Sequence, residues 1–362
     1  MPRGAAIATL VSLLSLADGT RLAPFVGINF AQKLAKNPLD KAVAANLLAT
    51  SCPDIRAVKI FDHDISVIQA LRAAGYTDIT LAVPNVELKE MSSSISLAGQ
   101  ITASLAPVVA AGVRLTIAVG NEPLATWYNG AYSPYLVGAL TNMRAALAAQ
   151  HLSSVRLTIP FDFGVVSASY PPSAGAFKNE LRDVILACAR ILQADGSNFM
   201  VNIYPFFTHQ NLPQVISLAY AVGDSGTTIE GIDYPCLLHV QVGHSRRSLL
   251  VHTDLQRFFA RKVRRLWSCG THLAAAPSRV QVAAVRAALL RLDASFGEDS
   301  LPIVIGETGW PTAGHPSASA ANAATYMRNM VTPSPRSPQE RCGASALRAF
   351  GTLCRWCSGQ RR

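Results

Sequence analysis

Two glutamates in this sequence lie in short motifs that combine glycine, polar residues and proline. Glu122 belongs to Gly120-Asn121-Glu122-Pro123, and Glu307 belongs to Gly306-Glu307-Thr308-Gly309-Trp310-Pro311. Each motif follows an apolar run, and proline marks the end of that run because it cannot donate to a strand ladder. We therefore expect each carboxyl group at a point where a buried strand opens into a loop.

Paired carboxyl groups in such positions suit the cleavage of a glycosidic bond. One carboxyl group protonates the leaving oxygen and the other attacks the sugar carbon; retention of configuration requires the two carboxyl groups to be about 5–5.5 Å apart. Asn121 could hydrogen-bond a sugar 2-hydroxyl, and Trp310 could offer an apolar face to a pyranose ring. The alternative is that both glutamates are structural, pairing with arginine or capping a helix. Their shared setting favours catalysis.

The elements that must position these residues follow a regular alternation. Short apolar runs, continuous enough for strands buried on both faces, alternate with helical patterns, which is typical of a parallel sheet. The runs cover residues 25–30, 57–62, 79–84, 114–122, 155–160, 199–205 and 301–311. The helical patterns cover residues 40–51, 66–74, 135–150, 178–195 and 280–296.

Seven runs fit an open doubly wound sheet as well as a barrel, so polar residues must decide the fold. Polar residues lie at the carboxyl ends of different runs, which is where (β/α)8 barrels have their catalytic residues. These residues are Asn29, Asp62, Asn85, Asn121, Glu122, Asp162, Tyr204 and Glu307. No Gly-x-Gly-x-x-Gly motif follows the first run, which disfavours nucleotide binding. We predict a (β/α)8 TIM barrel over residues 25–330.

Six stretches resemble the plant β-1,3-glucanases of glycoside hydrolase family 17, in the order that this family has them. They are Gly27–Phe30, Val58–Asp62, Ala118–Pro123, Pro172–Phe177, Val201–Phe206 and Gly306–Thr312. The resemblance implies a (β/α)8 fold, no cofactor, and endo-hydrolysis of β-1,3-glucan with retained configuration.

The same resemblance assigns roles to single residues. Glu122 matches the general acid/base and Glu307 matches the nucleophile. The substrate-binding residues that we expect beside them are Asn121, Tyr204, Trp310, Asn29 and Phe206. The family's usual tyrosine or tryptophan in the first strand is Phe30 here, which removes any hydroxyl contact from that position.

Two segments depart from the family pattern and carry the charge imbalance. The chain has 32 basic and 22 acidic residues, of which 14 and 2 lie in residues 236–279 and 332–362, so the remainder has a net charge of −2. We interpret residues 235–279 as an irregular insertion not selected to fold, such as translated intron sequence. A basic loop that binds an acidic polymer is the alternative. Because the basic residues are confined to these segments, we expect no nucleic-acid partner.

Residues 331–362 form an irregular tail where the family would supply an eighth strand. The tail is rich in Arg, Ser and Cys, with one apolar cluster at residues 347–350. We therefore expect the eighth strand to be missing, with a divergent strand near residues 348–353 as the alternative. A missing strand would leave the strand of the nucleophile unpaired on one side.

The first 17 residues have the features of a secretory signal peptide. A basic residue at Arg3 is followed by an apolar run from Ala5 to Leu16 that is too short to span a bilayer. We expect a secreted protein, extracellular or in the cell wall, and a monomer without a membrane span. Neither the histidines nor Cys354 and Cys357 have the spacing of a metal site, so we expect no metal.

The main prediction is therefore a retaining endo-β-1,3-glucanase. The alternative from another class is a glucan-binding or inactive protein that keeps the cleft without turnover, because of the expected loss of the last strand. Transglycosylation and mixed-linkage β-1,3-1,4-glucan also remain open, since acceptor choice depends on subsite shape.

Overall fold

The computed structural model describes residues 9–15, 24–31, 37–53, 55–234, 280–331 and 348–352. The predicted insertion at residues 235–279 and most of the predicted tail lie outside these residues. All seven apolar runs contain a strand, and all five helical patterns contain a helix, within a few residues of the predicted limits.

The strands of the main sheet are β1 (Thr9–Ser15), β2 (Pro24–Phe30), β3 (Ala57–Ile60), β4 (Asp78–Val83), β5 (Arg114–Val119), β6 (Arg156–Thr158), β7 (Pro160–Asp162), β10 (Phe199–Asn202), β13 (Ile303–Gly309) and β14 (Arg348–Thr352). Two small antiparallel pairs lie apart from it, β8 (Val166–Ala168) with β9 (Ala176–Phe177) and β11 (Thr227–Ile229) with β12 (Ile232–Tyr234).

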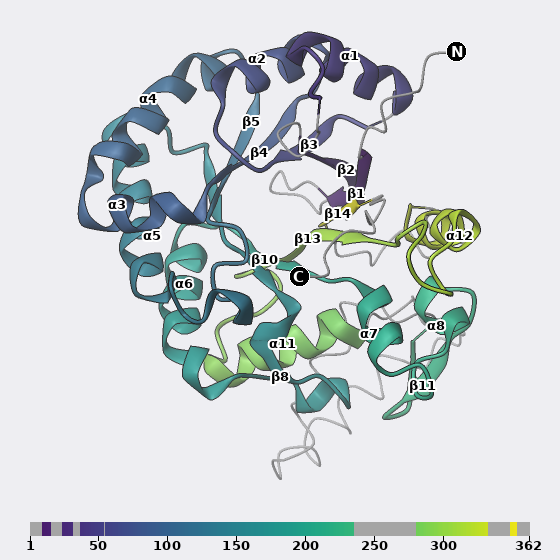
Figure 1. The fold of residues 1–362 in the computed structure, drawn as a ribbon. Coiled ribbons are helices and arrows are strands. Elements are labelled where there is room, and N and C mark those ends of the chain that lie inside the picture. Colours follow the sequence, from purple (N-terminus) through teal and green to yellow (C-terminus); the bar gives the residue numbers. More distant parts are fainter. Residues whose placement is uncertain are drawn as a thin grey trace, which may run out of the picture.

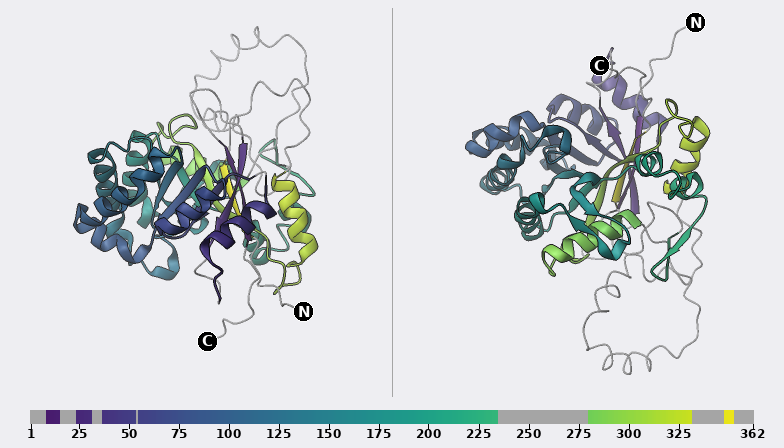
Figure 2. Two further views of the ribbon diagram at one scale, coloured as in Figure 1. Left: turned by 90° about the horizontal axis from the view of Figure 1, so that it is seen from above. Right: turned by 60° about the horizontal axis from the view of Figure 1, so that its bottom comes forward.

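The helices surround these strands, as Figure 1 shows. They are α1 (Lys41–Ser51), α2 (Ile65–Ala73), α3 (Leu88–Ser93), α4 (Ile95–Ala110), α5 (Ser133–Ala149), α6 (Arg182–Ala194), α7 (Pro205–Asn211), α8 (Leu218–Val222), α11 (Val280–Leu292) and α12 (Ala320–Val331). Figure 2 gives two further directions, in which the strands run side by side with helices outside them.

The main sheet closes into a ring of parallel strands. Its order is β6-β5-β4-β3-β2-β14-β13-β10-β7. The two ends of this order, β6 and β7, are halves of one strand that is interrupted only at Ile159. Its first half pairs with β5 and its second half with β10. The described strands therefore form the eight-stranded barrel that the sequence predicts.

The eighth strand of this ring corrects the expectation that it is missing. Residues Arg348–Thr352 pair in parallel with β13 on one side and β2 on the other. Backbone groups make these ladders, so a segment of unusual composition can still close the ring. The alternative of a divergent strand near residues 348–353 is the correct one.

β1 lies antiparallel to β2 over the whole of β2. It falls within the residues predicted as a signal peptide, which stays a prediction. Among the described residues no single helix is long and apolar enough to cross a membrane; one sharply bent pair, Asn85–Ser93 with Ile95–Ala110, reaches that length and apolarity jointly.

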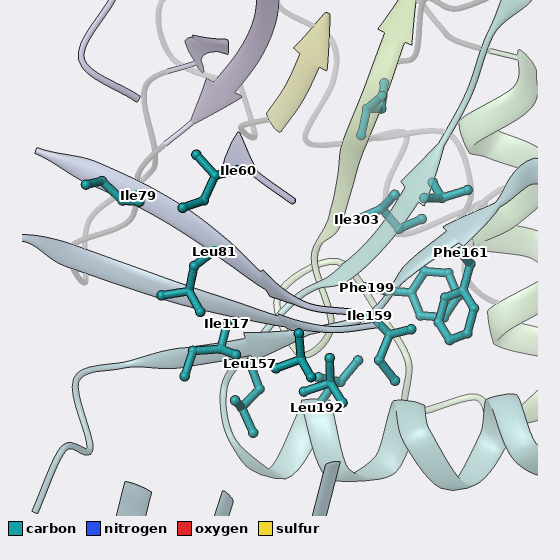
Figure 3. Packing of buried hydrophobic residues seen from close by; sticks show 14 of the residues in the cluster. Ile60, Ile79, Leu81, Ile117, Leu157, Ile159, Phe161, Leu192, Phe199 and Ile303 are labelled. Atoms are coloured by element: carbon teal, nitrogen blue, oxygen red, sulfur yellow. The ribbon is translucent and has the colours of Figure 1, made fainter. Parts of the chain in front are cut away.

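The barrel strands are buried on both faces. Their outward side chains pack against the helices. In Figure 3, Leu192 of α6 lies beneath Leu157, and the rings of Phe161 and Phe199 lie together. These two rings are stacked, with centroids 4.9 Å apart. A separate small cluster joins β3, β10 and β13 inside the ring, formed by Ala57, Met200 and Val304. Because side chains alternate along a strand, the residues two positions after Ala57 and Met200 face the same interior.

Candidate active site

Glu122 lies in a strained turn directly after β5. Its backbone is in the left-handed region, with φ of 51°, which is uncommon for a residue with a side chain and is often found at functional sites. Its backbone N–H donates to the carbonyl of Pro160 at 2.7 Å. Asn85 holds the preceding residue, since its amide donates to the Asn121 carbonyl and accepts from the Asn121 N–H, both at 2.8 Å. The turn thus aims the Glu122 carboxyl group from a fixed position.

Glu307 lies inside β13 and is 9% exposed. The pairing of β10 with β13 shifts register at this point, so that Val201 faces Ile305 whereas Asn202 faces Glu307. The skipped residue is Gly306, where a Cβ atom would lie 2.5 Å from Asn202 Oδ1. The glycine before the nucleophile candidate is therefore needed for the close approach of the two strands.

Two donors bind the two oxygens of the Glu307 carboxyl group. Lys59 Nζ forms an ion pair with Oε1 at 2.8 Å, and the Tyr204 hydroxyl donates to Oε2 at 2.7 Å. Charge-assisted bonds of this kind are short and strong. Glu307 is thereby held in a fixed orientation, as an attacking group must be.

Lys59 is a site residue that the sequence analysis did not single out. It is fully buried, lies 4.0 Å from the ring centroid of Phe61, and also donates to Asn121 Oδ1 at 3.3 Å. Lysine is almost never fully buried unless it is paired. A lysine inside the apolar run Ala57–Ile60 was therefore a signal that a buried carboxylate lies opposite.

Asn202 links the two glutamates and was also not singled out. Its amide donates to Glu122 Oε1 at 2.8 Å, and its backbone position pairs with Glu307 on β13 and with Asp162 on β7. The carboxyl ends of β5, β7, β10 and β13 thus bring four polar side chains together. The sequence predicted three of them at strand ends.

The surroundings of Glu122 raise its pKa toward neutrality. Burial is the main cause that raises its pKa, to about 7, and the negative charge of Glu307 adds to the rise. The hydrogen bond from Asn202 and the charge of Lys59 act in the opposite direction, whereas Asp162 adds to the rise. The pKa of Asp162 is also raised, mainly by burial. One protonated and one ionised carboxyl group side by side can act as acid and nucleophile.

Three of the five predicted substrate-binding residues are buried. Asn29 is fully buried and donates to the carbonyl of Gly306 at 3.3 Å, so it supports the strand of Glu307. Phe206 and Trp310 are 6% and 1% exposed. Asn121 and Tyr204 are half-buried. Contact of these five residues with a sugar stays a prediction.

The burial of Trp310 has a clear cause. Its ring packs edge-on against Phe206, with centroids 5.3 Å apart, and at a tilt against Tyr326 of α12, with centroids 5.5 Å apart. Its indole N–H donates to the Ser317 carbonyl at 2.9 Å. The exposed aromatic side chain beside the site is Phe207, which is 43% exposed and packs edge-on against Tyr204 at 5.8 Å. The sequence does not distinguish Phe206 from Phe207 because the two are adjacent.

No group of three or more His, Cys, Asp or Glu side chains in the described ranges could hold a metal ion. The described site consists of a carboxyl group with a raised pKa, a carboxylate paired with lysine, and amide and phenol donors around them.

A (β/α)8 barrel with this pair of carboxyl groups at the carboxyl ends of its strands is the framework of a glycoside hydrolase. Residues 26–242 and 265–347 match the pattern of Glycosyl hydrolases family 17, and the chain belongs to this family. The residues between the two matched parts, 243–264, lie within the predicted insertion.

The chain is similar to several characterised plant proteins. It is 30% identical over 279 residues to glucan endo-1,3-beta-glucosidase GII of Hordeum vulgare, covering 76% of this chain and 69% of that protein. It is 28% identical over the same length to a glucan endo-1,3-beta-glucosidase of Vitis vinifera, with the same coverage.

Solved structures show the same architecture. CJP38, a beta-1,3-glucanase and allergen of Cryptomeria japonica pollen, superposes with a TM-score of 0.69 at 26% identity, covering 89% of this chain and 87% of that one. A plant beta-glucan endohydrolase superposes with a TM-score of 0.63 at 21% identity, covering 86% and 87%. The similarity to the endohydrolase structure is evidence for the fold alone.

Proposed function

We propose that this protein hydrolyses internal β-1,3-glucosidic bonds of glucans with retention of configuration. The observation that carries the proposal is the contrast between Glu122, whose pKa is raised to about 7, and Glu307, which is paired with Lys59, at the carboxyl ends of strands of one barrel. The similarity to glucan endo-1,3-beta-glucosidases supports the substrate class.

The first half of the reaction breaks the glycosidic bond. Glu122 transfers its proton to the bridging oxygen while a Glu307 oxygen attacks the anomeric carbon. The leaving sugar departs as an alcohol, and a glucosyl ester on Glu307 remains. Lys59 and Tyr204 orient the attacking carboxylate, so little reorganisation is needed when it reacts.

The second half releases the glucosyl group. Glu122, now ionised, takes a proton from a water molecule that attacks the anomeric carbon from the side that the leaving group vacated. The ester bond breaks, Glu307 is again a carboxylate, and Glu122 is again protonated. The partly exposed ring of Phe207 is the aromatic surface that we expect to contact a glucosyl unit beside the nucleophile.

The test is release of reducing ends from a linear β-1,3-glucan by the purified chain, beside a Glu307→Gln variant. We expect oligosaccharides of several lengths from the wild-type chain and a loss of at least about 10⁴-fold in the variant. Binding of the glucan without release of reducing ends would instead indicate a non-catalytic protein. Parallel assays on mixed-linkage β-1,3-1,4-glucan, and product analysis at high acceptor concentration, separate the linkage and transglycosylation alternatives.

Secretion is part of the proposal and rests on residues 1–17. Expression of the full chain in a eukaryotic secretory host, followed by N-terminal sequencing of protein from the medium, tests it. We expect a new N-terminus close to residue 18; retention inside the cells with Met1 intact would contradict secretion. Sedimentation of the same material tests the expected monomer.

A further inference from the structure

Asn202 ends β10 at the centre of the site. Its neighbours across the sheet are Asp162 on one side and Glu307 on the other. The register shift beside Gly306 creates this arrangement, because it brings Glu307 level with Asn202. The side chain of Asn202 therefore reaches the carboxyl group of Glu122 from the strand that separates Asp162 from Glu307.

The Asn202 side chain is enclosed and its orientation is constrained. The residue is 2% exposed, and its Nδ2 donates to Glu122 Oε1 at 2.8 Å. Its Oδ1 is buried against Gly306 and has no hydrogen-bond partner among the described residues. A reversed amide would place two acceptor oxygens together whenever Glu122 is ionised. The site thus keeps the donor on Glu122 even though the other end of the amide stays unsatisfied.

We propose that Asn202 is the positioning residue of the acid/base glutamate, fixing Glu122 Oε1 as an acceptor so that the transferable proton resides on Oε2. This inference rests on the proposed function. In the first half-reaction the O–H bond at Oε2 breaks and the proton passes to the glycosidic oxygen. In the second half-reaction the proton lost by water returns to Oε2. The Asn202 N–H bonds Oε1 throughout.

A neutral donor suits a group that must gain and lose a proton in every cycle. The charged or titratable groups that face Glu122 are Glu307 from β13, Asp162 from β7 and Lys59 from β3. The buried ammonium group pairs with Glu307 and not with Glu122. A cationic partner would favour permanent ionisation of Glu122, and a second carboxylate would oppose ionisation. The amide of Asn202 orients the group without adding charge.

The experiment compares the wild-type chain with Asn202→Ala and the near-isosteric Asn202→Asp. Two substrates are used, a β-1,3-glucan, whose leaving group needs a proton, and a dinitrophenyl β-glucoside, whose leaving group does not. For both variants we expect a fall in kcat on the glucan of about 10- to 100-fold, and a change of no more than about threefold in the rate of dinitrophenol release. We also expect the alkaline limb of the kcat/KM profile to move to higher pH, because a donor to ionised Glu122 is lost.

A matched control is Asn198→Ala. Asn198 is also buried, at the opposite end of β10, and accepts a hydrogen bond from Thr158. It should lower thermal stability without changing the pH profile or the ratio of the two substrates. Equal losses on both substrates with an unmoved alkaline limb in the Asn202 variants would overturn the proposal, since that is the outcome of a structural role.

Carboxyl ¹³C titration of Glu122 separates this inference from the proposed function, because it needs no turnover. A wild-type chain that releases no reducing ends would contradict the proposed function. An unchanged Glu122 titration in a folded Asn202→Asp chain would contradict the positioning role, whether or not the wild-type chain is active. If Asn202→Ala does not fold, Asn202→Asp decides the matter.

Discussion

The two glutamates of the site end strands of one barrel, yet the groups around them differ in kind. Glu307 receives an ammonium group and a phenol, one on each carboxyl oxygen. Glu122 receives one neutral amide, and faces the charges of Glu307 and Asp162. The comparison shows that two buried carboxyl groups of one site can have partners of different charge. The buried ammonium group lies on Glu307, whereas the partner of Glu122 is neutral.

The most direct way to break the comparison is to remove the acid. Glu122→Ala should lower kcat on β-1,3-glucan by about 10²- to 10⁴-fold, because no other described group can protonate the leaving oxygen from that turn. A dinitrophenyl glucoside should be affected far less, and azide should restore part of the rate by attacking the glucosyl ester. Steady-state kinetics with both substrates measures this. The exposed Glu180→Ala is the matched control; an equal loss on both substrates without azide rescue would reject Glu122 as the acid.

Removing the cation tests the other side of the comparison. Lys59→Met should destabilise the protein by about 3–5 kcal/mol, because it leaves the Glu307 carboxylate buried without its partner. The double variant Lys59→Met with Glu307→Gln should recover most of this loss, since both charges are then gone. Urea unfolding of the two single variants and the double variant gives the coupling energy. Additive effects would show that the ion pair does not contribute.

The free energy of unfolding should depend on pH through the titration of Glu122. Its pKa rises from 4.5 to about 7 on folding, so the folded state binds the proton more tightly than the unfolded state. This contribution is fully present below about pH 4.5, decreases as pH rises, and is lost by about pH 7. The total is about 3 kcal/mol. Urea unfolding between pH 4 and 8 should show this decline in the wild-type chain and not in Glu122→Gln, which cannot titrate; identical slopes would argue against a buried acid.

A smaller effect is expected from the second donor to Glu307. Tyr204→Phe removes a hydrogen bond to a charged group, worth about 1.5–3 kcal/mol, and leaves the ring that packs against Phe207. The kcat on glucan should fall about 10- to 100-fold with little change in KM. A Tyr204→Phe chain with wild-type kcat would show that Lys59 alone orients the nucleophile. Tyr135→Phe, on α5, provides a control for the loss of a phenol.

The smallest change concerns the interaction between the two carboxyl groups themselves. Glu307→Gln removes the negative charge that helps to raise the pKa of Glu122, so that pKa should fall in the variant. Carboxyl ¹³C titration of Glu122 in both chains measures the direction. An unchanged titration would mean that burial alone accounts for the protonated acid.

Much of this arrangement could be predicted from the sequence because it is local. The strand runs and both glutamates follow from apolar continuity and from proline at strand ends. The partners of the glutamates do not, since Lys59 meets Glu307 and Asn202 meets Glu122 only when the ring closes. A lone lysine in an apolar strand signals some partner without saying which one.

One expectation failed because composition does not decide strand pairing. The last strand was not expected, since the tail is rich in Arg, Ser and Cys, yet its backbone groups pair with β13 and β2. The motif of Trp310 likewise gives no sign that its ring packs against Tyr326 of α12. In both cases the contact comes from a distant segment.

The pairing of β14 with β2 has a consequence for synthesis. Val26 is translated 323 residues before its partner Ala349. Until that later segment leaves the ribosome, β13 has β10 on one side and no strand of the ring on the other. The turn of Glu122 after β5 can form earlier, because the strands beside β5 are already made, whereas the strand of the attacking carboxylate gains its second neighbour only after β14 is made. The nucleophile is thus the last part of the machinery to be assembled.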